Sequence, residues 1–206
     1  MNYLALGDSM SIDQYTCTSG GGAVNQFARL VNADVLEDHT YDGCTTAGVL
    51  DELTRVTIQP DIITITAGGN DLILAAENKD NRREAVFSLA QPQNANYLLE
   101  NLDEIFIQVA RYRCSVILNT VYDPTDGDDT LLASLGFAPD FRVTYEQVNN
   151  HIRQLAQQHG YLLADLAFIF RGHGMTALDS WLTLQIEPNL AGATAIANCW
   201  YTRWLP

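Results

Sequence analysis

Polar residues that could perform acyl-transfer chemistry follow three apolar segments in the first third of the chain. Ser9 lies in GDS, Gly43 in YDGCTT and Asn70 in GGND. A serine hydroxyl can attack a carbonyl carbon when a base removes its proton. A backbone N–H at a glycine turn and a side-chain amide are suitable donors for the oxyanion that forms. Each residue alone could be a cap or turn residue, but the set predicts a serine-based acyl-transfer site.

Short β-rich runs alternate with helical periodicity along the whole chain. The predicted strands are residues 3–6, 34–38, 61–68, 114–122 and 161–166, and the predicted helices are 23–33, 47–56, 94–113, 142–160 and one that follows the Pro-Asn pair at 188–189. Strands separated by helices predict a five-stranded parallel sheet covered on both faces. Ligands bind such sheets beyond the carboxyl ends of the strands. Ser9, Gly43 and Asn70 follow the first three of those ends.

Composition narrows the classes of function. The chain has 206 residues, which fits one α/β domain over residues 1–206, and no apolar run is long enough for a membrane span. Acidic residues outnumber basic ones 25 to 11, for a formal charge of −14. This charge disfavours nucleic acid and anionic membranes as partners, because phosphate would be repelled. The sequence does not indicate an oligomeric state.

The cysteines and the acidic loop give no sign of a metal site. Four cysteines lie far apart without a CxxC or Cys/His cluster, so we expect no zinc and no other cofactor. The acidic loop YDPTDGDDT (122–130) lacks the ligand spacing of an EF-hand and predicts a solvated loop over the cleft. Since the first predicted strand begins almost at residue 1, we expect no signal peptide, a cytoplasmic location and reduced thiols.

The quoted segments carry a family resemblance. LALGDSMS, YDGCTT and TAGGNDL resemble, in order and spacing, the first three sequence blocks of the SGNH (GDSL) hydrolases. The resemblance implies a flavodoxin-like three-layer α/β/α sandwich and a small-molecule acyl ester as substrate, with the acyl and alcohol parts unassigned. It also implies that Ser9 is the nucleophile and that the N–H groups of Ser9 and Gly43 and the Asn70 side chain form an oxyanion hole. Asp8 would orient the Ser9 loop.

The final block departs from the family pattern. The family has Asp-x-x-His followed by Pro-Asn and a helix, whereas this chain has LQIEPN. Leu184 therefore stands at the position of the Asp, and Glu187 at that of the His. The residue that activates Ser9 must be sought among the remaining candidates.

Four histidines are candidates for the general base. His151 and His159 fall in one predicted amphipathic helix, which favours structural or solvated roles. His39 precedes Gly43 by four residues and could approach the site. His173 lies in RGHG, between the last predicted strand and the final block, and its flanking glycines give the backbone freedom to aim the imidazole. We expect His173 to be the general base.

Glu187 leaves three interpretations open. In the first, which we favour, Glu187 or Asp179 orients His173, as the acid of a catalytic triad orients its histidine. In the second, Glu187 itself takes the proton of Ser9; a carboxylate is a weak base for a hydroxyl, but burial raises its pKa. In the third, hydrolysis has been lost and the cleft binds a carbohydrate or a partner.

Overall fold

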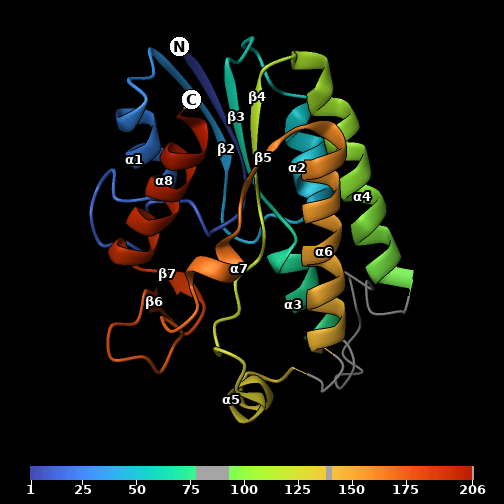
Figure 1. Ribbon diagram of the computed structural model, residues 1–206, viewed down its shortest axis with the longest axis vertical. Helices are drawn as coiled ribbons and strands as arrows, with labels where there is room; N and C mark the ends of the chain where they lie inside the picture. The colour runs from blue at the N-terminus through green and yellow to red at the C-terminus, as the bar shows by residue number, and fades with distance from the viewer. Residues whose placement is uncertain (78–92, 138–140, 206) are drawn as a thin grey trace.

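A five-stranded parallel sheet forms the middle layer of the molecule (Figure 1). The computed structural model describes residues 1–77, 93–137 and 141–205. The strands are β1 (Asn2–Gly7), β2 (Val35–Thr40), β3 (Ile62–Thr66), β4 (Ser115–Asn119) and β5 (Leu162–Ala164). Their order in the sheet is β2-β1-β3-β4-β5, and every neighbouring pair is parallel. The five predicted strands and their parallel arrangement are confirmed.

Helices cover both faces of the sheet, each over its own apolar core. One face carries α1 (Ala23–Leu30) and α8 (Leu190–Trp204), and the other carries α2 (Thr46–Leu53), α4 (Gln93–Val109) and α6 (Phe141–His159) (Figure 1). Both faces of a parallel sheet must be shielded from water in this way. The predicted three-layer α/β/α sandwich is therefore confirmed. Among the described residues, no helix combines the length and apolar character needed to span a membrane.

The core beneath α1 and α8 is built around aromatic side chains. The ring of Phe27 packs edge-on against Tyr3, with centroids 5.2 Å apart, and against Trp200, with centroids 5.6 Å apart. The indole N–H of Trp200 donates to the Asn119 side chain at 2.7 Å. Because this polar atom has a partner, the fully buried indole contributes its apolar area without a desolvation penalty.

Several short elements were not predicted from the sequence. They are α3 (Gly69–Glu77), the 3₁₀ turn η1 (Ala110–Tyr112), α5 (Asp129–Ser134), α7 (Leu166–Ile169), and a hairpin of β6 (Leu182–Thr183) and β7 (Glu187–Pro188). GGND thus opens a helix, and the acidic segment predicted as a loop contains the start of α5, whose N-terminal N–H groups are capped by Asp128. The strands of the hairpin are two residues long, too short for a periodic signal.

Candidate active site

The carboxyl ends of three adjacent strands meet at one edge of the sheet. Gly7, the last residue of β1, is in register with Thr40 on β2 and with Thr66 on β3. β1 lies between β2 and β3 in the sheet, so the order of strands reverses here, which is where open α/β sheets bind ligands. The segments that carry Ser9, Gly43 and Asn70 leave the sheet at this edge.

A tight turn after β1 fixes the position of Ser9. Gly7 has φ +135°, and a Cβ there would lie 2.0 Å from the carbonyl oxygen of Thr66, so the position requires glycine. The Asp8 N–H donates to that same carbonyl at 3.1 Å. The turn leaves Ser9 only 8% exposed. Ser9 is thus held against the end of β3 rather than on a free loop.

The Gly43 turn and the start of α3 lie together. The Cys44 N–H donates to the Tyr41 carbonyl at 3.3 Å, and Gly43 takes φ +77° inside this turn. The Asn70 amide donates to the Cys44 carbonyl at 2.9 Å. Within the described part of the chain, nothing accepts a hydrogen bond from the backbone N–H of Ser9 or of Gly43. Ser9 borders the cavity described below, whereas Gly43 is exposed and is not among the residues that line it.

Asp71 joins the first turns of α2 and α3. Its carboxylate accepts hydrogen bonds from the Thr46 N–H at 3.0 Å and from the Thr46 hydroxyl at 2.7 Å. Asn101 on α4 donates to the same hydroxyl at 3.0 Å. Burial raises the pKa of Asp71, while the bonds from Thr46 act in the opposite direction. This buried network holds the Gly43 turn, which directly precedes α2, at a fixed place relative to Asn70.

The β6–β7 hairpin brings Glu187 to the site. Glu187 opens β7 and pairs with Thr183 of β6. The turn between them places Leu184 at φ +46° and Gln185 at φ +74°, a conformation that L-residues adopt at a cost. The Tyr122 hydroxyl donates to the Ile186 carbonyl at 2.5 Å. This bond anchors the end of the turn, directly before Glu187.

Glu187 lies near Ser9. The two residues border the same cavity. Burial raises the pKa of Glu187, a hydrogen bond with the Ser9 side chain lowers it, and the charge of Asp42 raises it again. The net shift is upward, so the Glu187 carboxylate is a stronger base than an ordinary glutamate.

A second carboxyl borders that cavity. Asp8 is 1% exposed, and its burial raises its pKa to about 8. The sequence suggested only that Asp8 orients the loop, because a motif of three residues does not reveal how deeply the carboxyl is buried.

The cavity is lined by both polar and apolar side chains. Its volume is about 60 Å³. Its polar lining includes Asp8, Ser9, Asn70 and Glu187, and its apolar lining includes Leu72, Ile73, Val121, Leu132, Phe137 and Phe141. An ester whose carbonyl lies at Ser9 could place an apolar acyl group against these apolar side chains. Among the described residues, no group of three His, Cys, Asp or Glu side chains is arranged to hold a metal ion.

His173 makes its contacts away from this cavity. The N–H groups of its flanking glycines, Gly172 and Gly174, donate to the Asp126 carboxylate at 2.9 and 2.8 Å. Its Nδ1 lies 3.0 Å from Asp179, and its ring stacks on Trp181 with centroids 3.7 Å apart. Asp179 thus contacts His173 as the first interpretation requires. However, His173 is not among the residues that line the cavity, whereas Glu187 is.

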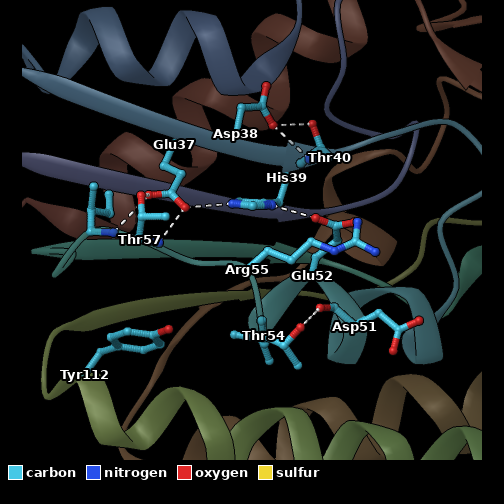
Figure 2. Close-up of polar contacts among 12 residues, drawn as sticks. Glu37, Asp38, His39, Thr40, Asp51, Glu52, Thr54, Arg55, Thr57 and Tyr112 are labelled. Carbon is cyan, nitrogen blue, oxygen red and sulfur yellow. Dashed lines mark hydrogen bonds and ion pairs between the residues drawn. The ribbon is translucent and has the colours of Figure 1, made fainter.

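His39, the other histidine considered as a base, is engaged by two glutamates. Figure 2 shows its ring between Glu37 and Glu52, with Nε2 2.8 Å from Glu37 and Nδ1 2.6 Å from Glu52. Both ring nitrogens therefore have carboxylate partners, which raises the pKa of His39 against the effect of burial. Neither nitrogen is therefore left to accept the proton of Ser9.

Comparisons with known proteins show the family and the fold. The model of the GDSL-like Lipase/Acylhydrolase family matches residues 5–195. Three solved structures share the fold: a member of the lipolytic G-D-S-L family from Veillonella parvula (16% identity, TM-score 0.68, 99% of this chain and 98% of that chain), a phospholipase A1 from Streptomyces albidoflavus (20%, 0.67, 98% and 98%) and an acetyl xylan esterase (15%, 0.71, 100% and 100%). No match was found among curated proteins.

Proposed function

The chain belongs to the GDSL-like lipase/acylhydrolase family, and we propose that it hydrolyses an acyl ester with Ser9 as nucleophile and Glu187 as general base. One observation carries the proposal: Ser9 and Glu187 border the same cavity, and Glu187 lies close enough to Ser9 for that side chain to lower its pKa. Family membership supports ester hydrolysis in general, and this contact supports the roles of the two residues.

In the first half of the reaction, Glu187 takes the proton of the Ser9 hydroxyl as the oxygen bonds to the ester carbonyl carbon. The carbonyl oxygen becomes an oxyanion, which the N–H groups of Ser9 and Gly43 and the Asn70 amide stabilise. The bond to the alkoxy group then breaks, and Glu187 returns its proton to the departing alcohol. An acyl group remains on Ser9.

In the second half, water repeats these steps. Glu187 takes a proton from the water as its oxygen attacks the acyl carbon. When the second oxyanion collapses, Ser9 leaves and recovers the proton from Glu187, and the carboxylic acid is released. Each proton goes to or from Glu187, whose raised pKa supports this role because a general base works best when its pKa lies close to the operating pH.

The choice of Glu187 departs from the expectation that His173 is the base. The contacts of His173 with Asp179 and Trp181 support a role in shaping its own loop. The apolar lining of the cavity favours a substrate ester with an apolar acyl group. The alcohol part of that ester is not assigned.

A serine-directed fluorophosphonate tests the proposal. We expect it to label the wild-type protein but not S9A, and we expect the wild type to release p-nitrophenol from p-nitrophenyl acetate. A related hydrolase treated in parallel shows that the reagent is active. If the folded wild type is neither labelled nor active while that hydrolase reacts, the enzyme proposal is wrong, and the interpretation of a non-catalytic cleft that binds a carbohydrate or a partner takes its place.

A further inference from the structure

We propose that Asp8 works as an uncharged carboxylic acid, and that its ionisation in alkaline solution suppresses hydrolysis at Ser9. The inference rests on the ester hydrolysis proposed above. It makes Asp8 a positioning residue, which sets the charge beside the reacting atoms and exchanges no proton with the substrate.

Two carboxyl groups lie around one nucleophile. Asp8 directly precedes Ser9, and Glu187 lies close enough to the Ser9 side chain for that side chain to lower its pKa. Both carboxyls border the same cavity. When two carboxyls share a site, the proton stays on one of them, because two adjacent negative charges repel each other. The more buried group keeps it, and Asp8 is 1% exposed, whereas Glu187 is partly exposed.

Neutral groups surround the Asp8 carboxyl. Its Oδ1 accepts the Met10 N–H at 3.2 Å, and the Thr66 hydroxyl, which accepts the Asp8 N–H at 3.1 Å, also acts to lower its pKa. Its Oδ2 lies 3.7 Å from where a Cβ on Gly69 would sit, so backbone closes that side. Two neutral donors do not offset the cost of burying a full charge.

No cation is among the largest influences on the Asp8 carboxyl in the described part of the chain. The charged groups with the largest effect on it are Glu187 from β7 and Asp71 from α3, both of them acids. The other titratable groups coupled to Asp8 are the Cys44 thiol before α2 and the Tyr122 phenol after β4, and both pKa values are raised. Burial and acidic neighbours together raise the pKa of Asp8 to about 8.

The charge of Asp8 matters because the reaction moves negative charge toward it. Before proton transfer the negative charge is on the partly exposed Glu187, where solvent screens it. Afterwards it is on the oxyanion, held by the N–H of Ser9, the residue bonded to Asp8. An ionised Asp8 would oppose the oxyanion more than it opposes the solvent-screened charge on Glu187. The neutral acid does not.

The variant D8N tests the proposal, because asparagine matches the shape of the protonated acid and cannot ionise. We expect wild-type kcat/KM for p-nitrophenyl acetate, corrected with S9A, to fall about tenfold per pH unit above the pKa of Asp8. The profile of D8N should lack this alkaline decline. D42N is the matched control, since Asp42 acts on Glu187 and is not among the groups that act on Asp8, and it should keep the decline.

Two kinetic outcomes would overturn the inference. One is a D8N profile that declines at the same alkaline pH as the wild type. The other is a folded D8N without activity at any pH, which would mean that Asp8 acts in its ionised form.

A second measurement does not depend on activity or on the folding of a variant. In wild-type protein labelled with ¹³C at the aspartate carboxyl carbons, one resonance should titrate near pH 8. If every aspartate resonance titrates in the ordinary acidic range, the inference is wrong, whether or not the protein proves to be an esterase. If this resonance titrates as expected but the protein hydrolyses no ester, the proposed function fails and the charge state of Asp8 stands.

Discussion

At the scale of single residues, Glu187 and His173 make opposite predictions. If Glu187 is the base, E187Q removes proton transfer and should lower kcat/KM for p-nitrophenyl acetate roughly a hundred- to ten-thousandfold. H173A should change it only a few fold, because the imidazole faces Asp179 and Trp181. Activity should also fall as the pH drops through the raised pKa of Glu187, since only the ionised carboxylate accepts a proton. Steady-state kinetics over a pH series measures all three effects.

The same pair of variants can contradict this assignment. If H173A loses as much activity as E187Q while both remain folded, His173 belongs to the proton path and Glu187 orients it. Circular dichroism spectra of the two variants provide the folding control. Fluorophosphonate labelling adds a check, because E187Q should slow labelling of Ser9 only if Glu187 activates that hydroxyl.

At the scale of elements, the sequence revealed the strand ends better than it revealed the hairpin. Ser9 and Gly43 could be assigned to one site because each follows a strand, and parallel strands end at a common edge. The contact of Glu187 with Ser9 could not be predicted in this way. It depends on a turn in which Leu184 and Gln185 take positive φ without glycine, and no local propensity signals such a turn.

The network around His39 joins β2, α2 and the segment before β3, and it makes a second prediction at this scale. Burial raises the pKa of Glu37, but its hydrogen bond with His39 and the bonds that it accepts from the N–H groups of Thr57 and Ile58, at 2.8 and 3.0 Å, lower that pKa to about 2. Figure 2 shows His39 and Thr57 on either side of Glu37. His39 has a raised pKa, so its stabilising contribution is complete below its unfolded value of 6.5 and is lost as the pH rises through its folded value. Glu37 has a lowered pKa, so it stabilises the folded state above pH 4.5, its unfolded pKa. That stability is lost as the pH falls toward 2, its folded pKa.

We therefore expect the network to stabilise the fold most between about pH 4.5 and 6.5. H39Q should remove the alkaline part of this dependence and lower the free energy of unfolding within the window by roughly 1 kcal/mol. Urea unfolding at a series of pH values measures both quantities. H159Q is the matched control, because His159 stacks on Tyr161 at the end of α6 and its replacement should leave the pH dependence in place. A wild-type curve that does not change with pH above the window would contradict the assigned role of His39.

At the scale of the whole molecule, alternation of strands and helices was enough to predict the parallel sheet and its two covered faces. The long amphipathic helices and the strands rich in β-branched residues have strong hydrophobic patterns. The two cores form where the apolar faces of the helices meet the sheet. The β6–β7 hairpin is held instead by contacts such as that of the Tyr122 hydroxyl with the Ile186 carbonyl. Such contacts between distant segments leave no pattern in the neighbouring sequence.

The net charge of −14 gives a prediction for the molecule as a whole. Repulsion among excess carboxylates destabilises the compact state, and salt screens charges separated by more than about 8 Å at physiological ionic strength. The close pairs, such as Arg142 with Asp123 at 2.6 Å, are partly buried and are screened less. Raising NaCl from about 0.02 to 0.3 M should therefore raise Tm by roughly 2–4 °C, which corresponds to about 1 kcal/mol for a chain of this size. KCl should act equally if screening is the cause, and a fall in Tm would mean that the local ion pairs outweigh the repulsion.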